Sequence, residues 1–202
     1  MPADDFVFPP APQASLAVQG TDARFPMRRI FCVGRNYEAH AREMGKDPTR
    51  EAPFFFTKPA DAALDTPCTI PYPPQTEDLH HEIELVIAIG KGGRNIAEAD
   101  VMDHVWGASV GIDLTRRDLQ AEAKKAGRPW DWGKAFDNSA PIAALKPIAD
   151  VPSVEQGRIW LAVNGEVRQD ADLADLFSRW TTEVWRRTRL PQRSRRLPVV
   201  LA

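Results

Sequence analysis

Apolar and polar residues alternate most clearly over residues 79–90, LHHEIELVIAIG. A two-residue period is typical of a β-strand whose side chains point alternately to its two faces. One face of this strand carries Glu82 and Glu84. The other face is entirely aliphatic and is expected to lie in the core: Ile83, Leu85, Ile87 and Ile89.

Shorter apolar runs predict further strands at residues 29–34, 54–57 and 105–112. Residues 158–168 predict a hairpin, because Asn164-Gly165 stands between two alternating runs and this dipeptide favours a tight turn. Residues 1–27 are expected to form an irregular arm with short extended pieces such as residues 15–18. The four prolines of residues 67–76 indicate a loop.

Three segments have helical patterns: residues 36–44, 97–103 and 115–126. Gly45 and Gly127 stand where left-handed helix caps are expected, and a proline follows each of them. The strands outnumber the helices and do not alternate with them regularly. The pattern therefore predicts an α+β fold with a strand-rich core.

The composition is that of an ordinary globular protein. Lys and Arg number 26 against 28 Asp and Glu, so the net charge of -2 gives no reason to expect nucleic acid or an anionic membrane as a partner. No apolar run approaches the roughly 20 residues of a membrane span, and the N-terminus lacks the pattern of a secretory signal. Cys32 and Cys68 are expected to be small buried residues of a cytoplasmic protein rather than a disulfide.

The last 26 residues differ from the rest. Residues 177–202 hold seven arginines and a single glutamate, and no strand or helix pattern is evident beyond Leu190. One interpretation is a solvated basic tail. The favoured one is a segment that did not evolve with this fold, such as a frameshift product.

Acidic residues supply the first candidate site. Glu82 and Glu84 share a strand face, and Asp113 follows the next apolar strand. Three carboxylates favour a hard cation, Mg²⁺ or Mn²⁺, with open positions for substrate and water. His80 lies on the same face and makes a mixed zinc site a rival. A solvated strand face remains the simpler explanation of the spacing.

Two further groups of residues have spacings suited to chemistry. His40 and Glu43 lie three apart on a predicted helix, so the carboxylate could orient the imidazole as a general base, or the two could form only a surface pair. Arg117 and Gln120 lie one helical turn apart and could bind a carboxylate or carbonyl. Lys134, near Trp130 and Trp132, could stabilise an oxyanion, although such tryptophans are more often core residues.

Six sequence blocks occur in an order that resembles the fumarylacetoacetate hydrolase family, especially its bacterial acylpyruvate and fumarylpyruvate hydrolases. The resemblance covers about residues 16–176 and rests on these blocks: CVGRNYEAHAREMG, FFFTKP, HHEIELVIAIGKGGRNI, GASVGIDLTRRDLQ, KKAGRPWDWGKAFDNSAPI and VNGEVRQDADLADL. It implies a mixed β-roll that is usually dimeric. The implied organisation is an arm (1–27), an incomplete catalytic domain (28–176) and an atypical Arg-rich tail (177–202).

The resemblance also implies roles for individual residues. It implies that Mg²⁺ or Mn²⁺ is held by Glu82, Glu84 and Asp113, and that His40, oriented by Glu43, activates a water. It implies that Lys134 stabilises the oxyanion. The implied substrate contacts are Lys58, Arg117 and Gln120, together with Arg35 and Tyr37 from the N-terminal block.

The implied activity is hydrolysis of a C–C bond in an acylpyruvate, most notably fumarylpyruvate in aromatic-compound catabolism. Decarboxylation of oxaloacetate or isomerisation of a related 2-oxo acid is an alternative within the family. The family pattern normally continues with a PGD turn and a GTPxGVG loop, and neither follows Leu176 here. A non-catalytic remnant is therefore the third possibility, and poor folding or weak activity is expected.

Overall fold

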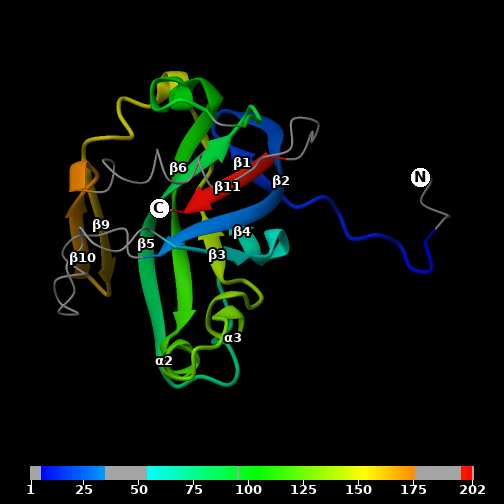
Figure 1. Cartoon of the computed structure of the whole chain (residues 1–202), viewed down its shortest axis with the longest axis vertical. Helices are drawn as coiled ribbons and strands as arrows, with labels where there is room; N and C mark the ends of the chain where they lie inside the picture. Colours follow the sequence, from blue (N-terminus) through cyan, green and yellow to red (C-terminus); the bar gives the residue numbers. More distant parts are fainter. Residues whose placement is uncertain (1–5, 35–53, 95, 176–196, 202) are drawn as a thin grey trace.

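The structure is a computed structural model that describes residues 6–34, 54–94, 96–175 and 197–201. Strands dominate these residues, which confirms the α+β prediction (Figure 1). The main sheet has nine strands in the order β1-β2-β11-β5-β6-β7-β4, with β3 paired to β2 and β8 paired to β6. A separate two-stranded sheet holds β9 and β10.

The bounds of the strands are β1 Ser15–Val18, β2 Thr21–Gly34, β3 Phe54–Lys58, β4 Ala63–Asp65, β5 Leu79–Ile89, β6 Val105–Arg116, β7 Ala140–Ile142, β8 Lys146–Pro147, β9 Arg158–Val163, β10 Glu166–Asp172 and β11 Leu197–Leu201. The α-helices are α2 Arg117–Lys125 and α3 Asp131–Lys134. Three 3-10 helices, η2 Ala60–Ala62, η3 Glu98–His104 and η4 Ile148–Asp150, complete the described elements.

The expected strand at residues 79–90 is β5, but its aliphatic face is not its only buried face. Leu85, Ile87 and Ile89 enter one core cluster, as the pattern predicted. Val86 and Ala88 are fully buried in a second cluster on the opposite side. The first half of β5, which carries the glutamates, has one polar face. The second half is buried on both faces, so the prediction of a single core face was wrong there.

The N-terminal arm is more ordered than its composition suggested. The extended piece at residues 15–18 is confirmed as β1, but residues 21–27 belong to the long strand β2 rather than to an irregular segment. Phe25 and Met27 are buried while Arg24 and Arg28 are exposed, so the strand does alternate. The flanking charges and Pro26 hid that alternation in the sequence.

The C-terminal strand β11 contradicts the expectation that no regular element follows Leu190. It lies between β2 and β5, parallel to the first and antiparallel to the second (Figure 1). Val199 and Leu201 are fully buried in the second core cluster. Residues 197–201 are thus an interior strand of this sheet, whereas residues 177–196 lie outside the described part of the chain.

The other local features agree with the sequence pattern only in part. The hairpin is β9–β10, with Asn164 at φ 53° and Gly165 at φ 85°, as the Asn-Gly turn predicted. Gly127 has φ 63° at the end of α2, confirming the predicted cap, although the helix begins only at Arg117. The helix expected at residues 97–103 is the 3-10 helix η3, Glu98–His104, and not an α-helix. Cys32 is buried, but Cys68 is exposed, contrary to prediction, and neither is in a disulfide.

Within the described residues, no helix is both long and apolar enough to cross a membrane.

Candidate active site

The pairing of β5 with β6 brings the predicted carboxylates together. Glu82 lies directly opposite Asp113, and residues directly opposite in an antiparallel pair project from the same face. Glu84, two residues along β5, lies opposite Gly111, where no side chain competes for the space. The register therefore places all three carboxylates on one face. The two-residue period had predicted this for Glu82 and Glu84, and Asp113 had been only a candidate third member.

Lys134 lies between two of these carboxylates. Its Nζ donates to Glu82 Oε2 and to Asp113 Oδ2, each at 2.7 Å, and its side chain is 2% exposed. Burial alone would lower the pKa of Lys134, but the ion pairs with Asp113 and Glu82 outweigh burial and raise it. The ammonium is thus held in its charged form beside the carboxylates.

Lys58, an expected substrate contact, is wholly buried beneath this pair. Its Nζ is 2.9 Å from Asp113 Oδ1 and donates to the backbone carbonyls of Leu114, at 3.0 Å, and Lys134. These bonds fix both the Asp113 carboxylate and the short helix that carries Lys134. The described contacts of Lys58 are therefore structural ones.

Replacing Lys58 by methionine is expected to destabilise the protein by about 3–5 kcal/mol, because the buried Asp113 carboxylate loses one of its two cations and two backbone carbonyls lose a charged donor. Chemical denaturation of the variant measures this loss. Lys125→Met, on the exposed end of α2, is the matched control and should unfold like the wild type. Equal stability of Lys58→Met and the control would show that the Lys58 ion pair does not support the fold.

Arg117 and Gln120 lie at the start of α2 and contact each other. Arg117 Nη1 donates to Gln120 Oε1 at 2.6 Å, while Nη2 pairs with Glu82 Oε1. Burial alone would raise the pKa of Glu82, but Lys134 and Arg117 lower it to about 2. The sequence correctly paired Arg117 with Gln120 by helical spacing but gave no sign of the bond to Glu82.

Sequence reasoning missed the contact that anchors this helix start. Asp118 accepts from Thr76 Oγ1 at 2.6 Å and from the backbone N–H of Glu77 at 3.0 Å. These bonds attach the proline-rich loop to α2 next to Arg117, and they hold the pKa of Asp118 below its ordinary value. An acidic residue in the first turn of a helix was the available signal.

The third carboxylate, Glu84, differs from Glu82 and Asp113 in its surroundings. Its Oε2 is buried and has no hydrogen-bond partner among the described residues. Burial raises its pKa well above the ordinary value, and repulsion by Asp113 and Glu82 adds to the effect. A buried carboxylate oxygen without a hydrogen-bond partner destabilises the fold. Such an oxygen is suited to binding a cation.

The three carboxylates have the chemistry of a hard-cation site but not its ready-made geometry. Among the described residues, no three His, Cys, Asp or Glu side chains converge as metal ligands. The cations of Lys134 and Arg117 lie against Glu82 and Asp113 instead. His80 is exposed, and its Nε2 lies 3.0 Å from Asp78 Oδ1. It therefore pairs with Asp78 rather than with the glutamates, which does not favour the zinc alternative.

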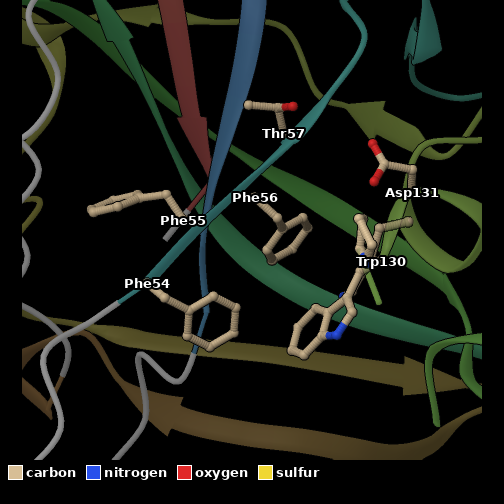
Figure 2. Close-up of a pocket in the computed structure, with 8 residues that line it drawn as sticks. Phe54, Phe55, Phe56, Thr57, Trp130 and Asp131 are labelled. Atoms are coloured by element: carbon tan, nitrogen blue, oxygen red, sulfur yellow. The ribbon is translucent and has the colours of Figure 1, made fainter. Parts of the chain in front are cut away.

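A cavity of about 360 Å³ adjoins Lys134, between β3 and the α3 segment (Figure 2). It is lined by Phe54, Phe55, Phe56, Thr57, Pro129, Trp130, Asp131 and Lys134. Trp130 faces this cavity and Trp132 is 74% exposed, so neither is the core residue expected from its type. The cavity was not predicted because β3 and α3 are more than 70 positions apart in the sequence.

The remaining predicted site residues are Arg35, Tyr37, His40 and Glu43. They lie outside the described residues, and their roles stay predictions.

Known proteins resemble this chain over most of its length. A sequence model of the fumarylacetoacetate (FAA) hydrolase C-terminal family matches residues 29–183. The fumarylpyruvate hydrolase of Pseudomonas aeruginosa, crystallised with Mn²⁺ and pyruvate, superposes with a TM-score of 0.89 at 46% identity, over 97% of this chain and 85% of that one.

Curated relatives have a different activity. A mitochondrial oxaloacetate tautomerase of Arabidopsis thaliana is 41% identical over 74% of this chain, and the match spans 66% of the relative, just under two thirds of its length. An oxaloacetate tautomerase of Escherichia coli is 39% identical over 79% of this chain and 73% of its own. The family match and these identities lead to one conclusion: the chain belongs to the fumarylacetoacetate hydrolase family.

Proposed function

We propose that this protein hydrolyses a C–C bond of an acylpyruvate, with a divalent cation held by Glu82, Glu84 and Asp113. The observation that carries the proposal is the strand face that holds three carboxylates, two of which, Glu82 and Asp113, are paired with Lys134 or Arg117. The similarity to a fumarylpyruvate hydrolase crystallised with Mn²⁺ and pyruvate supports both the metal and the substrate class. Fumarylpyruvate is therefore the first substrate to test.

The donor set suits Mg²⁺ or Mn²⁺, because all three candidate ligands are carboxylates and Glu84 Oε2 is buried without a partner. When bound, the cation would polarise the 2-oxo acid and stabilise negative charge that develops on it. Binding would require Lys134 and Arg117 to give up part of their contact with Glu82 and Asp113. Those two side chains would then be free to bind the substrate.

The residues of the chain account for the other steps. His40, oriented by Glu43, takes a proton from a water, and the resulting hydroxide adds to the carbonyl of the acyl group. The Lys134 ammonium exchanges a carboxylate partner for the new oxyanion. When the carbonyl re-forms, the C–C bond breaks and its electron pair passes to the pyruvate carbon, which then takes up a proton. Arg117 and Gln120 hold the substrate's carboxylate or carbonyl oxygens.

Oxaloacetate tautomerisation is the second candidate, because curated relatives near 40% identity carry that activity. It would use the same carboxylate face, since both reactions place negative charge on a 2-oxo acid. It needs no activated water, so His40 and Glu43 would lose their hydrolytic role.

Loss of the fumarylpyruvate absorbance in the ultraviolet tests the proposal. We expect decay with Mg²⁺ or Mn²⁺ and none with EDTA, with pyruvate and fumarate formed in equal amounts. Metal-independent decay, or no decay while oxaloacetate is tautomerised, would reject hydrolysis as the activity.

Replacing His40 by alanine separates the two candidates. The substitution should lower hydrolysis by about 10²–10⁴-fold, the usual contribution of a general base, while metal binding is unchanged. The variant is assayed on fumarylpyruvate and on enol oxaloacetate in parallel. Undiminished hydrolysis would remove His40 from the mechanism.

A further inference from the structure

The cavity beside Lys134 is built on the same two segments as the proposed catalytic cluster. Along β3, a two-residue period places Phe54, Phe56 and Lys58 on one face. The backbone N–H of Lys134 bonds the carbonyl of Trp130 at 2.9 Å, so these two residues lie one helical turn apart. The face that positions Lys58 and Lys134 at the carboxylates therefore continues directly into the cavity wall.

Aromatic rings form most of that wall. The Phe54 and Trp130 rings meet edge to face, with centroids 5.0 Å apart and an interplanar angle of 89°. The ring centroids of Phe56 and Trp130 are 5.9 Å apart, and Lys134 Nζ lies 4.9 Å from the centroid of the Phe56 ring. Figure 2 shows Thr57 and Asp131 at the end of the cavity away from Phe54. The interior thus presents flat apolar surfaces that begin at the catalytic ammonium.

We propose that this cavity is the subsite for the acyl group of the substrate and that it selects flat, unsaturated or aromatic acyl groups. The inference rests on the proposed function, because it requires the 2-oxo acid end to lie at the carboxylate cluster. An acyl carbonyl near Lys134 would direct its substituent along β3, onto the cavity wall formed by Phe54, Phe56 and Trp130. A planar group there lies against these rings, a contact that a small acyl group such as acetyl cannot make to the same extent.

Two probes that cannot be hydrolysed test the subsite without turnover. 2-Oxobutanoate and 2-oxo-4-phenylbutanoate both carry the 2-oxo acid and lack the second carbonyl, and only the latter has a ring. Calorimetric titration with Mn²⁺ present should show that the phenyl group tightens binding to the wild type by about tenfold or more.

Variants locate that gain. Trp130→Ala should abolish the phenyl gain while leaving 2-oxobutanoate affinity unchanged, and Phe54→Leu, which keeps apolar volume, should reduce it. Trp132→Ala is the matched control, because Trp132 is 74% exposed and two positions away, and it should keep the whole gain.

Three results would overturn the inference: no phenyl gain in the wild type, the same gain in Trp130→Ala as in the control, or no binding of either probe. A phenyl gain that depends on Trp130, in a protein that hydrolyses no acylpyruvate, would reject the proposed reaction but retain the subsite. Hydrolysis of an acylpyruvate without a phenyl gain would support the proposed reaction and reject the subsite.

Discussion

Replacing Glu84 by glutamine is expected to stabilise the metal-free protein while it removes activity. In the wild type the Glu84 carboxylate is buried, repelled by Asp113 and Glu82, and left with an unpartnered oxygen. An uncharged amide of the same size removes the repulsion, so unfolding without metal should become harder by about 1 kcal/mol. The lost ligand should reduce hydrolysis by more than about 100-fold, the loss typical even of residues that support a metal ligand.

Thermal unfolding with EDTA, with and without added Mn²⁺, measures the stability half of this prediction. Mn²⁺ should raise the unfolding temperature of the wild type and not that of Glu84→Gln. Glu122→Gln, on the exposed face of α2, is the control and should resemble the wild type in every assay. If Glu84→Gln is less stable without metal, Glu84 supports the fold, and its assignment as a ligand loses its physical basis.

Placing an aspartate at Val199 is expected to unfold much of the protein. Val199 is fully buried in β11, opposite Ala88 of β5, inside the second core cluster. An unpaired carboxylate there should cost roughly 4 kcal/mol or more, which is a large share of the roughly 5–15 kcal/mol that stabilises a domain. Circular dichroism and chemical denaturation should show lost or weakened cooperative unfolding.

Val167→Asp makes the same chemical change in β10, where the residue is 46% exposed, and it should shift stability by no more than about 0.5 kcal/mol. The comparison tests whether the C-terminal strand belongs to the core. Equal stability of the two variants would mean that β11 does not occupy the centre of the sheet in solution, as expected if residues 177–202 were foreign to the fold.

The face of β5 shows how much of the site local sequence could predict. Glu82 and Glu84 share a face by the strand period, and Asp113 lies in the next strand, β6, so a common face for the three carboxylates required only that the two strands pair. The interaction of Lys134 with Glu82 and Asp113 could not be predicted in this way. Lys134 stands on a four-residue helix, and its long side chain contacts residues 52 and 21 positions earlier in the sequence, Glu82 and Asp113.

The sequence did not predict elements whose conformation depends on residues far away along the chain. Leu197–Leu201 is a short apolar run beside arginines, and nothing local distinguishes it from a tail. Its strand conformation depends on β2 and β5, more than 100 residues earlier. The cavity behind Lys134 likewise needs Phe54 and Phe56 from β3 to meet Trp130, although the alternation of Phe54, Phe56 and Lys58 was readable in the sequence.

Titration of the purified, metal-free protein with Mn²⁺, followed by electron paramagnetic resonance of the free ion, tests the central claim most directly. We expect one bound ion per chain in the wild type and in Glu122→Gln, and greatly weakened binding in Glu84→Gln. Stoichiometric binding that Glu84→Gln leaves unchanged, or no binding by the wild type, would contradict the assignment of Glu82, Glu84 and Asp113 as a divalent-cation site.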